Sequence, residues 1–192
     1  MAETNGLARL RGYFAEHGML LCSILEDLPS LEKLGANIAD ATPLIESGEV
    51  FLLRAAGGRS AYITREVFGL LRPGKPHLDG LTRHAVQILG FLRGVEAASV
   101  PEIRRGLGLS RPDCNRAMGE LQRHMLITAM WEEERKSPNW VTYRWGTTES
   151  WEKRHGFVPM EMEKEERMRR LREMLTPPFP DRYLRAMFRY VL

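Results

Sequence analysis

The side chains best suited to binding chemistry are arginines and an asparagine in the segment 110–125. Guanidinium groups bind phosphate oxygens and guanine edges, and an asparagine amide pairs with adenine, so this combination is typical of proteins that bind duplex DNA. On a helix turning by about 100° per residue, the outward face consists of Pro112, Arg116, Gly119 and Arg123. The candidates for DNA contact are Arg111, Asn115 on the flank of that face, Arg116 and Arg123.

A well-delimited helix is predicted to carry these candidates. Ser110 is a favourable N-cap, and Asp113 lies where the positive end of a helix stabilises a carboxylate. The predicted buried stripe on the opposite face is Cys114, Ala117, Met118, Leu121 and Met125.

Two shorter helices are predicted before it. The first is capped by Thr82, ends at Gly94 and buries Ala85, Ile88, Leu89 and Leu92. The second begins at the capping box Ser99-Val-Pro-Glu102, stops at Gly108 and buries Val100, Ile103 and Leu107. Two helices joined by a tight turn, the second of them outwardly basic, indicate a helix-turn-helix.

A β-hairpin is predicted next, because residues 126–131 and 140–145 are rich in β-branched and aromatic side chains. The polar residues 132–139 form its expected tip, in the position of a wing. The tip supplies two further candidates for DNA contact, Arg135 and Lys136. It also carries the acidic run Glu132–Glu134, which repels phosphate. Strand alternation places Glu133 on the opposite face from its two neighbours, so adjacent carboxylates form no catalytic pair. Residues 81–151 are therefore predicted to form a winged helix-turn-helix.

The N-terminal residues 1–80 predict a second, winged-helix-like unit containing a hairpin over residues 50–64. A short helix opens this unit, residues 19–25 form a buried strand or helix, residues 28–34 a helix capped by Ser30, and residues 35–43 a loop. The Pro/Gly-rich segment from residue 73 to about residue 80 marks the boundary with the next unit. The predicted fold is thus α+β and mainly helical, with two packed winged-helix-like units and a C-terminal helical extension.

The extension comprises residues 152–192; a connector is predicted over residues 149–159, and a charged helix over 161–175. A last helix begins at Asp181, and its apolar strip consists of Leu184, Met187, Phe188 and Val191. Two interpretations are open: the strip packs on the chain's own core, or it pairs two copies in a homodimer.

Several stretches resemble the interstrand-crosslink-repair DNA glycosylase family, and especially its shorter glycosylase-related relatives. They are PEIRRGLGLSRPDCNRAMGELQRHMLIT with the tryptophan-rich hairpin, LPSLEKL at 28–34 and GRSAYITRE at 58–66. The resemblance implies stacked winged helices that bind duplex DNA in repair or mobile-element contexts. Full-length glycosylases of this family carry two catalytic glutamines separated by one residue. The only glutamines here, Gln87 and Gln122, lack that spacing, so no catalytic residue is carried over.

Composition narrows the class of protein further. A net charge of +3 and a pI near 9.0 are compatible with nucleic acid as a partner. Cys22 and Cys114 are far apart without metal-ligand spacing, the five histidines stand in no catalytic pattern, and no apolar run is long enough to span a membrane. We expect a cytoplasmic protein without metal or cofactor that does not associate with membranes.

Three functions remain open at this point. The first is non-catalytic binding of double-stranded DNA in repair or transcriptional regulation. The second is a repair enzyme that hydrolyses a glycosidic bond with residues other than glutamine. The third is a protein-interaction module that presents its acidic wing to a partner.

Overall fold

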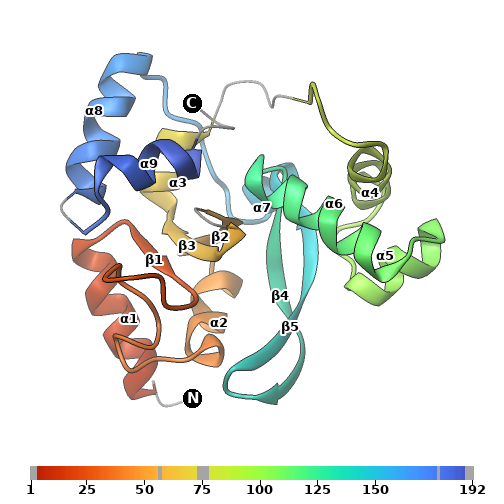
Figure 1. Ribbon diagram of the computed structural model, residues 1–192, viewed down its shortest axis with the longest axis horizontal. Helices are drawn as coiled ribbons and strands as arrows, with labels where there is room; N and C mark the ends of the chain where they lie inside the picture. The colour runs from red at the N-terminus through yellow and green to blue at the C-terminus, as the bar shows by residue number, and fades with distance from the viewer. Residues whose placement is uncertain (1–3, 56–57, 73–77, 177, 189–192) are drawn as a thin grey trace.

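One long β-hairpin lies between two lobes of the molecule (Figure 1). The computed structural model describes residues 4–55, 58–72, 78–176 and 178–188. The predicted α+β class, with more helix than strand, is confirmed. The first lobe contains the N-terminal elements together with the C-terminal helices, and the second contains three helices that follow the boundary segment.

The first lobe is built on a three-stranded antiparallel sheet of order β1-β3-β2. Its elements are α1 (Asn5–Glu16), β1 (Met19–Leu21), α2 (Ile38–Glu46), β2 (Val50–Arg54), β3 (Ser60–Thr64) and α3 (Arg65–Leu71). The predicted hairpin over residues 50–64 is confirmed, with Val50 opposite Thr64 and Arg54 opposite Ser60. β2 is an edge strand of this sheet, which leaves one side of its backbone available for other partners.

Two predictions in this lobe are wrong. Residues 28–34 form turns and not a helix, and Ser30 caps nothing but pairs with Leu21 in an isolated parallel bridge. The segment 35–43, predicted as a loop, contains the start of α2, where Asn37 and Asp40 form a reciprocal capping box. Pro43 lies inside α2. Because proline normally disfavours a helix interior, its presence among small residues led to the prediction of a loop.

The second lobe consists of α4 (Arg83–Arg93), α5 (Val100–Leu107) and α6 (Arg111–Arg123). Each predicted N-cap is confirmed, because the side chains of Thr82, Ser99 and Ser110 accept the expected backbone N–H groups. The predicted buried stripe of α4 forms one hydrophobic cluster with Ile103 and with most of the predicted stripe of α6. Met125, the last residue of that stripe, is buried in a different cluster together with Phe51 and Trp151. In α5, Val100 and Leu107 are only partly buried at its edge.

The hairpin consists of β4 (Ile127–Ser137) and β5 (Trp140–Thr147). Its strands continue through most of the segment predicted as a polar tip, so the turn is only Pro138 and Asn139. Three register shifts interrupt the pairing. Irregular pairing of this kind bends and twists the strands. The hairpin is longer than its apolar ends predict.

The two halves of the chain have a similar order of elements, with an additional helix before the hairpin in the second half. In the first, β1 pairs with β3, the second strand of the hairpin β2–β3. In the second, Ala98 takes the place of β1 and forms an antiparallel bridge with Trp145 in β5. In each half a helix precedes this strand or bridge, and another helix precedes the hairpin.

The C-terminal helices return to the first lobe (Figure 1). They are α7 (Thr148–Arg154), α8 (Lys164–Leu175) and α9 (Asp181–Phe188), and α7 lies where a connector is predicted. Leu171, Leu175, Phe179 and Leu184 are buried in the same cluster as Phe51, Phe68 and Trp151. The side chains of Met187 and Phe188, and all of Val191, lie outside the described residues, so the homodimer remains a prediction while Leu184 packs on the chain's own core.

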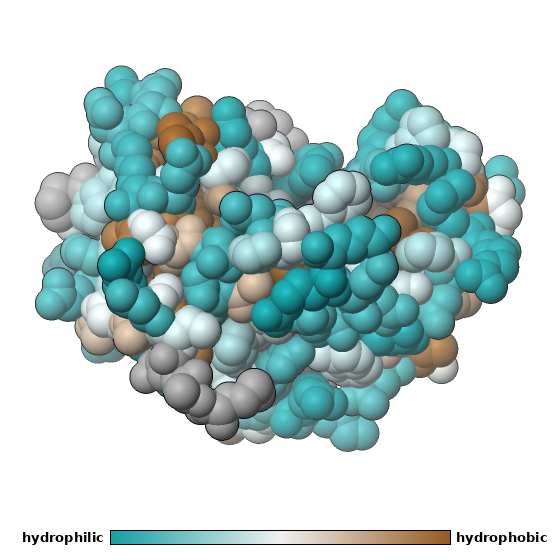
Figure 2. Space-filling view, turned by 90° about the horizontal axis from the view of Figure 1, so that it is seen from below, coloured by the Kyte–Doolittle hydropathy of each residue, from teal (hydrophilic) through white to brown (hydrophobic). Residues whose placement is uncertain are grey.

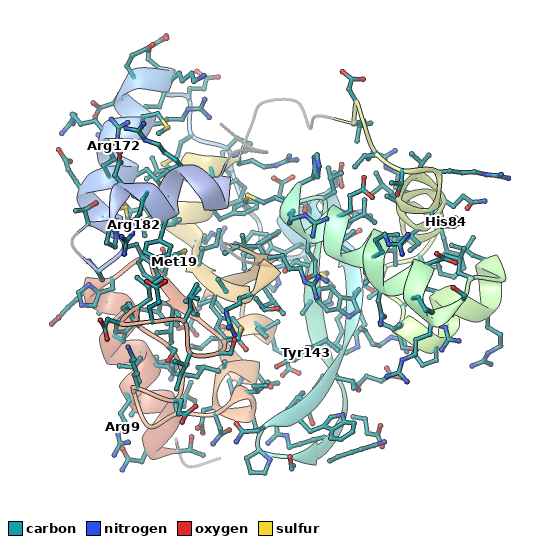
Figure 3. The ribbon with its side chains drawn as sticks, in the orientation of Figure 1. Arg9, Met19, His84, Tyr143, Arg172 and Arg182 are labelled. Atoms are coloured by element: carbon teal, nitrogen blue, oxygen red, sulfur yellow. The ribbon has the colours of Figure 1, made fainter. Side chains whose placement is uncertain are left out.

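Hydrogen bonds attach the hairpin to the first lobe along its length. The Thr128 hydroxyl binds both backbone polar atoms of Leu52, and the N–H of Ala39 donates to the carbonyl of Pro138 at 2.9 Å. Tyr143 lies at this junction, and its hydroxyl is 3.3 Å from that of Thr42 (Figure 3). The hairpin therefore joins the lobes, and its first-lobe face is not available to a partner.

Candidate nucleic-acid interface

The exposed face of α6 is shorter than the sequence predicts. Arg111, Asn115 and Arg116 in its first half are exposed, and Arg123 at its end is partly exposed. Gly119, predicted on the same outward face, is buried. Arg54 at the end of β2 covers it: a β-carbon added at Gly119 would lie 2.6 Å from Nη1 of Arg54. The prediction failed here because Arg54 belongs to the other half of the chain.

The helices of the second lobe carry most of the arginines that have no partner. Within the described ranges, seven arginines have side chains without a hydrogen bond, ion pair or ring contact, and six of these are on α4, α5 or α6. Elsewhere arginines are mostly paired, as Arg72 is with Glu152 at 2.5 Å and Arg169 with Glu166 at 2.7 Å. The seven are Arg54, Arg83, Arg104, Arg105, Arg111, Arg116 and Arg123.

Neither carboxylate of α6 forms an ion pair with an arginine among the residues described. Glu120 is buried and accepts the backbone N–H of Thr82 at 2.8 Å and its hydroxyl at 2.6 Å, so it holds the start of α4. Asp113 accepts the hydroxyl of Ser110 at 2.6 Å at the start of α6. The arginines on the outward face of α6 consequently have no carboxylate partner within this helix.

A shallow hollow of about 350 Å³ lies at the turn between α5 and α6, and Arg104 and Arg105 line it with Pro101, Gly108 and Leu109. The Nε atom of Arg104 is buried there without a hydrogen-bond partner among the described residues. Sequence reasoning missed both arginines. The available signal was a pair of arginines in the last turn of a helix directly before the turn glycine.

The structure separates the hairpin candidates from those on α6. Arg135 and Lys136 lie near the turn, at the opposite end of the hairpin from α6 (Figure 1). Arg135 binds Glu132 at 2.5 Å, and this hydrogen bond raises the pKa of the guanidinium. Lys136 lies 3.6 Å from Glu134. Their charges are compensated within the chain, unlike those of Arg111, Arg116 and Arg123.

The hairpin carboxylates form no catalytic pair. Glu133 binds Arg144 at 2.9 Å, while its neighbours Glu132 and Glu134 bind different cations. Arg144 also reaches Glu102 at 2.7 Å. The backbone N–H of Ser99, together with Arg144, holds the pKa of Glu102 below its usual value. Glu102 is therefore an ionised acceptor and is not poised as a proton donor.

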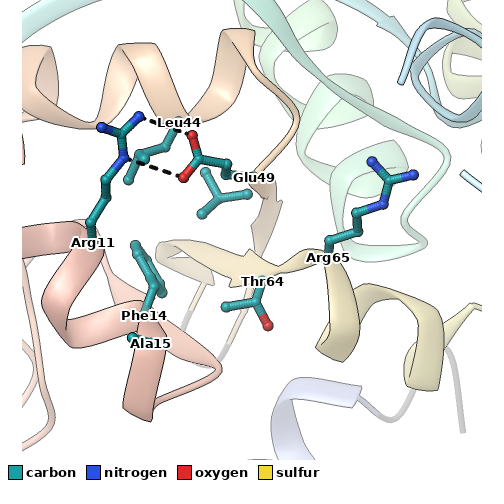
Figure 4. A pocket seen from close by; sticks show the side chains of 8 residues that line it. Arg11, Phe14, Ala15, Leu44, Glu49, Thr64 and Arg65 are labelled. Carbon is teal, nitrogen blue, oxygen red and sulfur yellow. Dashed lines mark hydrogen bonds and ion pairs between the residues drawn. The ribbon is translucent and has the colours of Figure 1, made fainter. Parts of the chain in front are cut away.

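A larger hollow, of about 610 Å³, lies between the start of α5 and the outer part of the hairpin. Its lining combines aromatic side chains, among them the exposed Trp140, with Glu133 and Glu134. A hollow of about 440 Å³ in the first lobe is bordered by the ion pair of Arg11 and Glu49 (Figure 4). Neither hollow is lined by one of the seven unpaired arginines.

The remaining candidates for chemistry are thiols and imidazoles. Cys22 and Cys114 are both free thiols. Burial raises the pKa of Cys22 to about 12, and it also raises the pKa of Cys114, so neither is a reactive thiolate. No group of three or more metal-ligating side chains occurs in the portion of the chain that is described. Nor does any described helix have both the length and the apolar character needed to cross a membrane.

The surface view gives the setting of the interface. Viewed from below, the molecule is mainly hydrophilic, and its outline is indented between the two lobes (Figure 2).

The fold and the arginines together define an α+β protein with a concentrated basic surface on the second lobe. The chain belongs to the AlkZ-related family, whose model matches residues 55–190. This family relates it to the AlkZ crosslink-repair glycosylases and so suggests a role connected with DNA repair. Comparison with curated proteins gives no match.

Proposed function

We propose that this protein binds duplex DNA through α6 without catalysing a reaction on it. In this proposal each half of the chain is a winged helix, which the similar order of elements supports. The second half presents α6 as the helix that enters the major groove, with Arg111, Asn115 and Arg116 directed to DNA. The hairpin serves as a connection to the first lobe.

The observation that carries the proposal is the distribution of unpaired arginines. Guanidinium groups lower their energy by binding anions, and most arginines outside the second lobe already do so within the chain. Those on α4, α5 and α6 do not, and they share one lobe. Duplex DNA supplies a regular array of phosphates for such a surface.

The test is titration of a fluorescently labelled random-sequence duplex at several salt concentrations. Each phosphate that is neutralised contributes about −0.9 to the slope of log K against log salt concentration. With three or four arginines engaged, we expect a slope of roughly −3. Affinity that is absent, or that does not change with salt, would refute DNA binding by this surface and would favour the protein-interaction module.

A second candidate function, a glycosylase that uses residues other than the glutamine pair, is favoured by the family relationship. The ion pairs of Glu132, Glu133 and Glu134 weigh against these residues as general bases, because each would first have to leave its cation. Release of alkylated base from a treated duplex distinguishes the two functions. A time course that exceeds the rate without protein would establish the enzyme.

A further inference from the structure

Arg54 occupies the gap in the basic face of α6. Arg116 comes three residues before Gly119 and Arg123 four residues after it, so both flank this glycine on one face of the helix. Arg54 comes from the edge strand β2 of the first lobe, and its Nη1 lies where a β-carbon of residue 119 would be crowded at 2.6 Å. We propose that Arg54 binds the DNA backbone together with Arg116 and Arg123, so that the first lobe contributes to the interface.

This inference rests on the proposed function and specifies a phosphodiester-binding row composed of Arg116, Arg54 and Arg123. The row spans seven residues of α6, or about 10 Å along its axis. Successive phosphates of one DNA strand advance by about 3.4 Å along the duplex, so about three phosphates lie within that length. Three guanidinium groups and three phosphates are thus matched in number and extent.

Charge supports the same conclusion. None of the three guanidinium groups has a carboxylate partner among the residues described, although acidic residues are available on neighbouring elements. Glu120, one turn from Arg116, is turned inward to Thr82. Three like charges on one face repel one another, and a polyanion relieves that repulsion.

The alternative is that Arg54 only covers α6 and contributes packing. The two roles differ in their salt dependence. Arg54→Met keeps the aliphatic length and removes the charge, so it retains most of the cover. We expect it to weaken binding uniformly across duplex sequences and to reduce the magnitude of the salt slope by about 1.

Arg170→Met is the matched control. Arg170 lies on α8, where it binds Glu166 at 2.9 Å, and its replacement changes the net charge by the same amount. It should leave the slope unchanged. A folded Arg54→Met variant with the wild-type slope would overturn the inference, whereas a wild type without any salt-dependent binding would overturn the proposed function itself.

Gly119→Ala provides a second test that leaves Arg54 in place. The new methyl group meets the far end of a flexible side chain and displaces the guanidinium. We expect Gly119→Ala to reduce the magnitude of the salt slope as Arg54→Met does. The double variant Arg54→Met, Gly119→Ala should have the same slope as Arg54→Met alone. Additive effects on binding would contradict the proposal. If Arg54→Met does not fold, the variants Gly119→Ala and Arg54→Lys test the proposal in its place. Arg54→Lys keeps the positive charge and should retain most of the salt slope, whereas Gly119→Ala should reduce the magnitude of the slope.

Discussion

The hydroxyl of Thr128 in β4 binds both backbone polar atoms of Leu52 in β2. It accepts from the Leu52 N–H at 3.1 Å and donates to the Leu52 carbonyl at 3.0 Å. Both residues are buried, and β2 is an edge strand whose outer backbone groups have no neighbouring strand. At the junction between the lobes, the Thr128 side chain thus supplies the hydrogen-bond partners that a neighbouring strand would supply to Leu52.

Thr128→Val should destabilise the protein. Valine retains the shape of threonine, but it leaves the N–H and the carbonyl of Leu52 buried without a partner, at a cost of about 1–3 kcal/mol per group. Urea unfolding measures the loss, which we expect to be about 2 kcal/mol or more. Thr142→Val on the exposed part of β5 is the control, since its hydroxyl makes only a 3.4 Å bond to Glu134. Equal losses in both variants would contradict the role of Thr128.

Arg116→Ala should weaken DNA binding by about 1–3 kcal/mol if this side chain reads a base edge, and by less if it touches phosphate alone. Titrations with duplexes of different sequence separate these cases, because only a base contact makes the loss depend on sequence. Thermal unfolding confirms that the variant is folded. Wild-type affinity in the folded double variant Arg116→Ala, Arg123→Ala would remove α6 from the interface.

Leu184→Ala should lower the stability of the chain by about 2–5 kcal/mol, because a buried leucine is replaced within a core. Light scattering after size-exclusion chromatography measures the molecular mass in parallel. Deletion of residues 177–192 should lower the melting temperature at unchanged monomer mass if α9 acts only within its own chain. A wild-type dimer that becomes a stable monomer on deletion would instead establish the homodimer.

Acidification should destabilise the protein through His155. Burial, together with the charges of Arg154 and Arg65, lowers the pKa of His155 in the folded chain below 6.5. Below that pH the unfolded state takes up a proton that the folded state does not, so stability falls as pH falls. Urea unfolding between pH 7 and pH 5 should show a shallower decline for His155→Gln than for wild type. Identical pH profiles would contradict this assignment.

The sequence predicted the second lobe well because its signals are local. Capping residues and a helical period specify α4, α5 and α6, and all three caps are observed. Exposure of Arg111 and Arg116 follows from the same period. The helical period does not indicate which other part of the chain covers a helix face. Gly119 is covered by Arg54, which is 65 positions away in the sequence.

Predictions for the first lobe and the hairpin were weaker for a related reason. α2 depends on a capping box at Asn37 and on burial against the hairpin, which outweigh the cost of Pro43. The outer part of β4 contains charged residues that no strand propensity favours. It is held by β5 and by contacts to α2, including the bond from the Glu132 N–H to the Glu46 carboxylate at 3.0 Å. Such stabilisation arises only after the lobes meet.

The return of the last helices to the first lobe has a consequence for synthesis on the ribosome. The core around Phe51 and Phe68 is completed by Leu171, Leu175 and Leu184. Domains generally fold in the order in which they are made, but here the first core is completed by residues that follow the whole second lobe in the chain. Its apolar side chains remain without α8 and α9 until those helices have been made. The nascent protein therefore presents the second lobe, with its arginine-bearing helices, before the first lobe is closed.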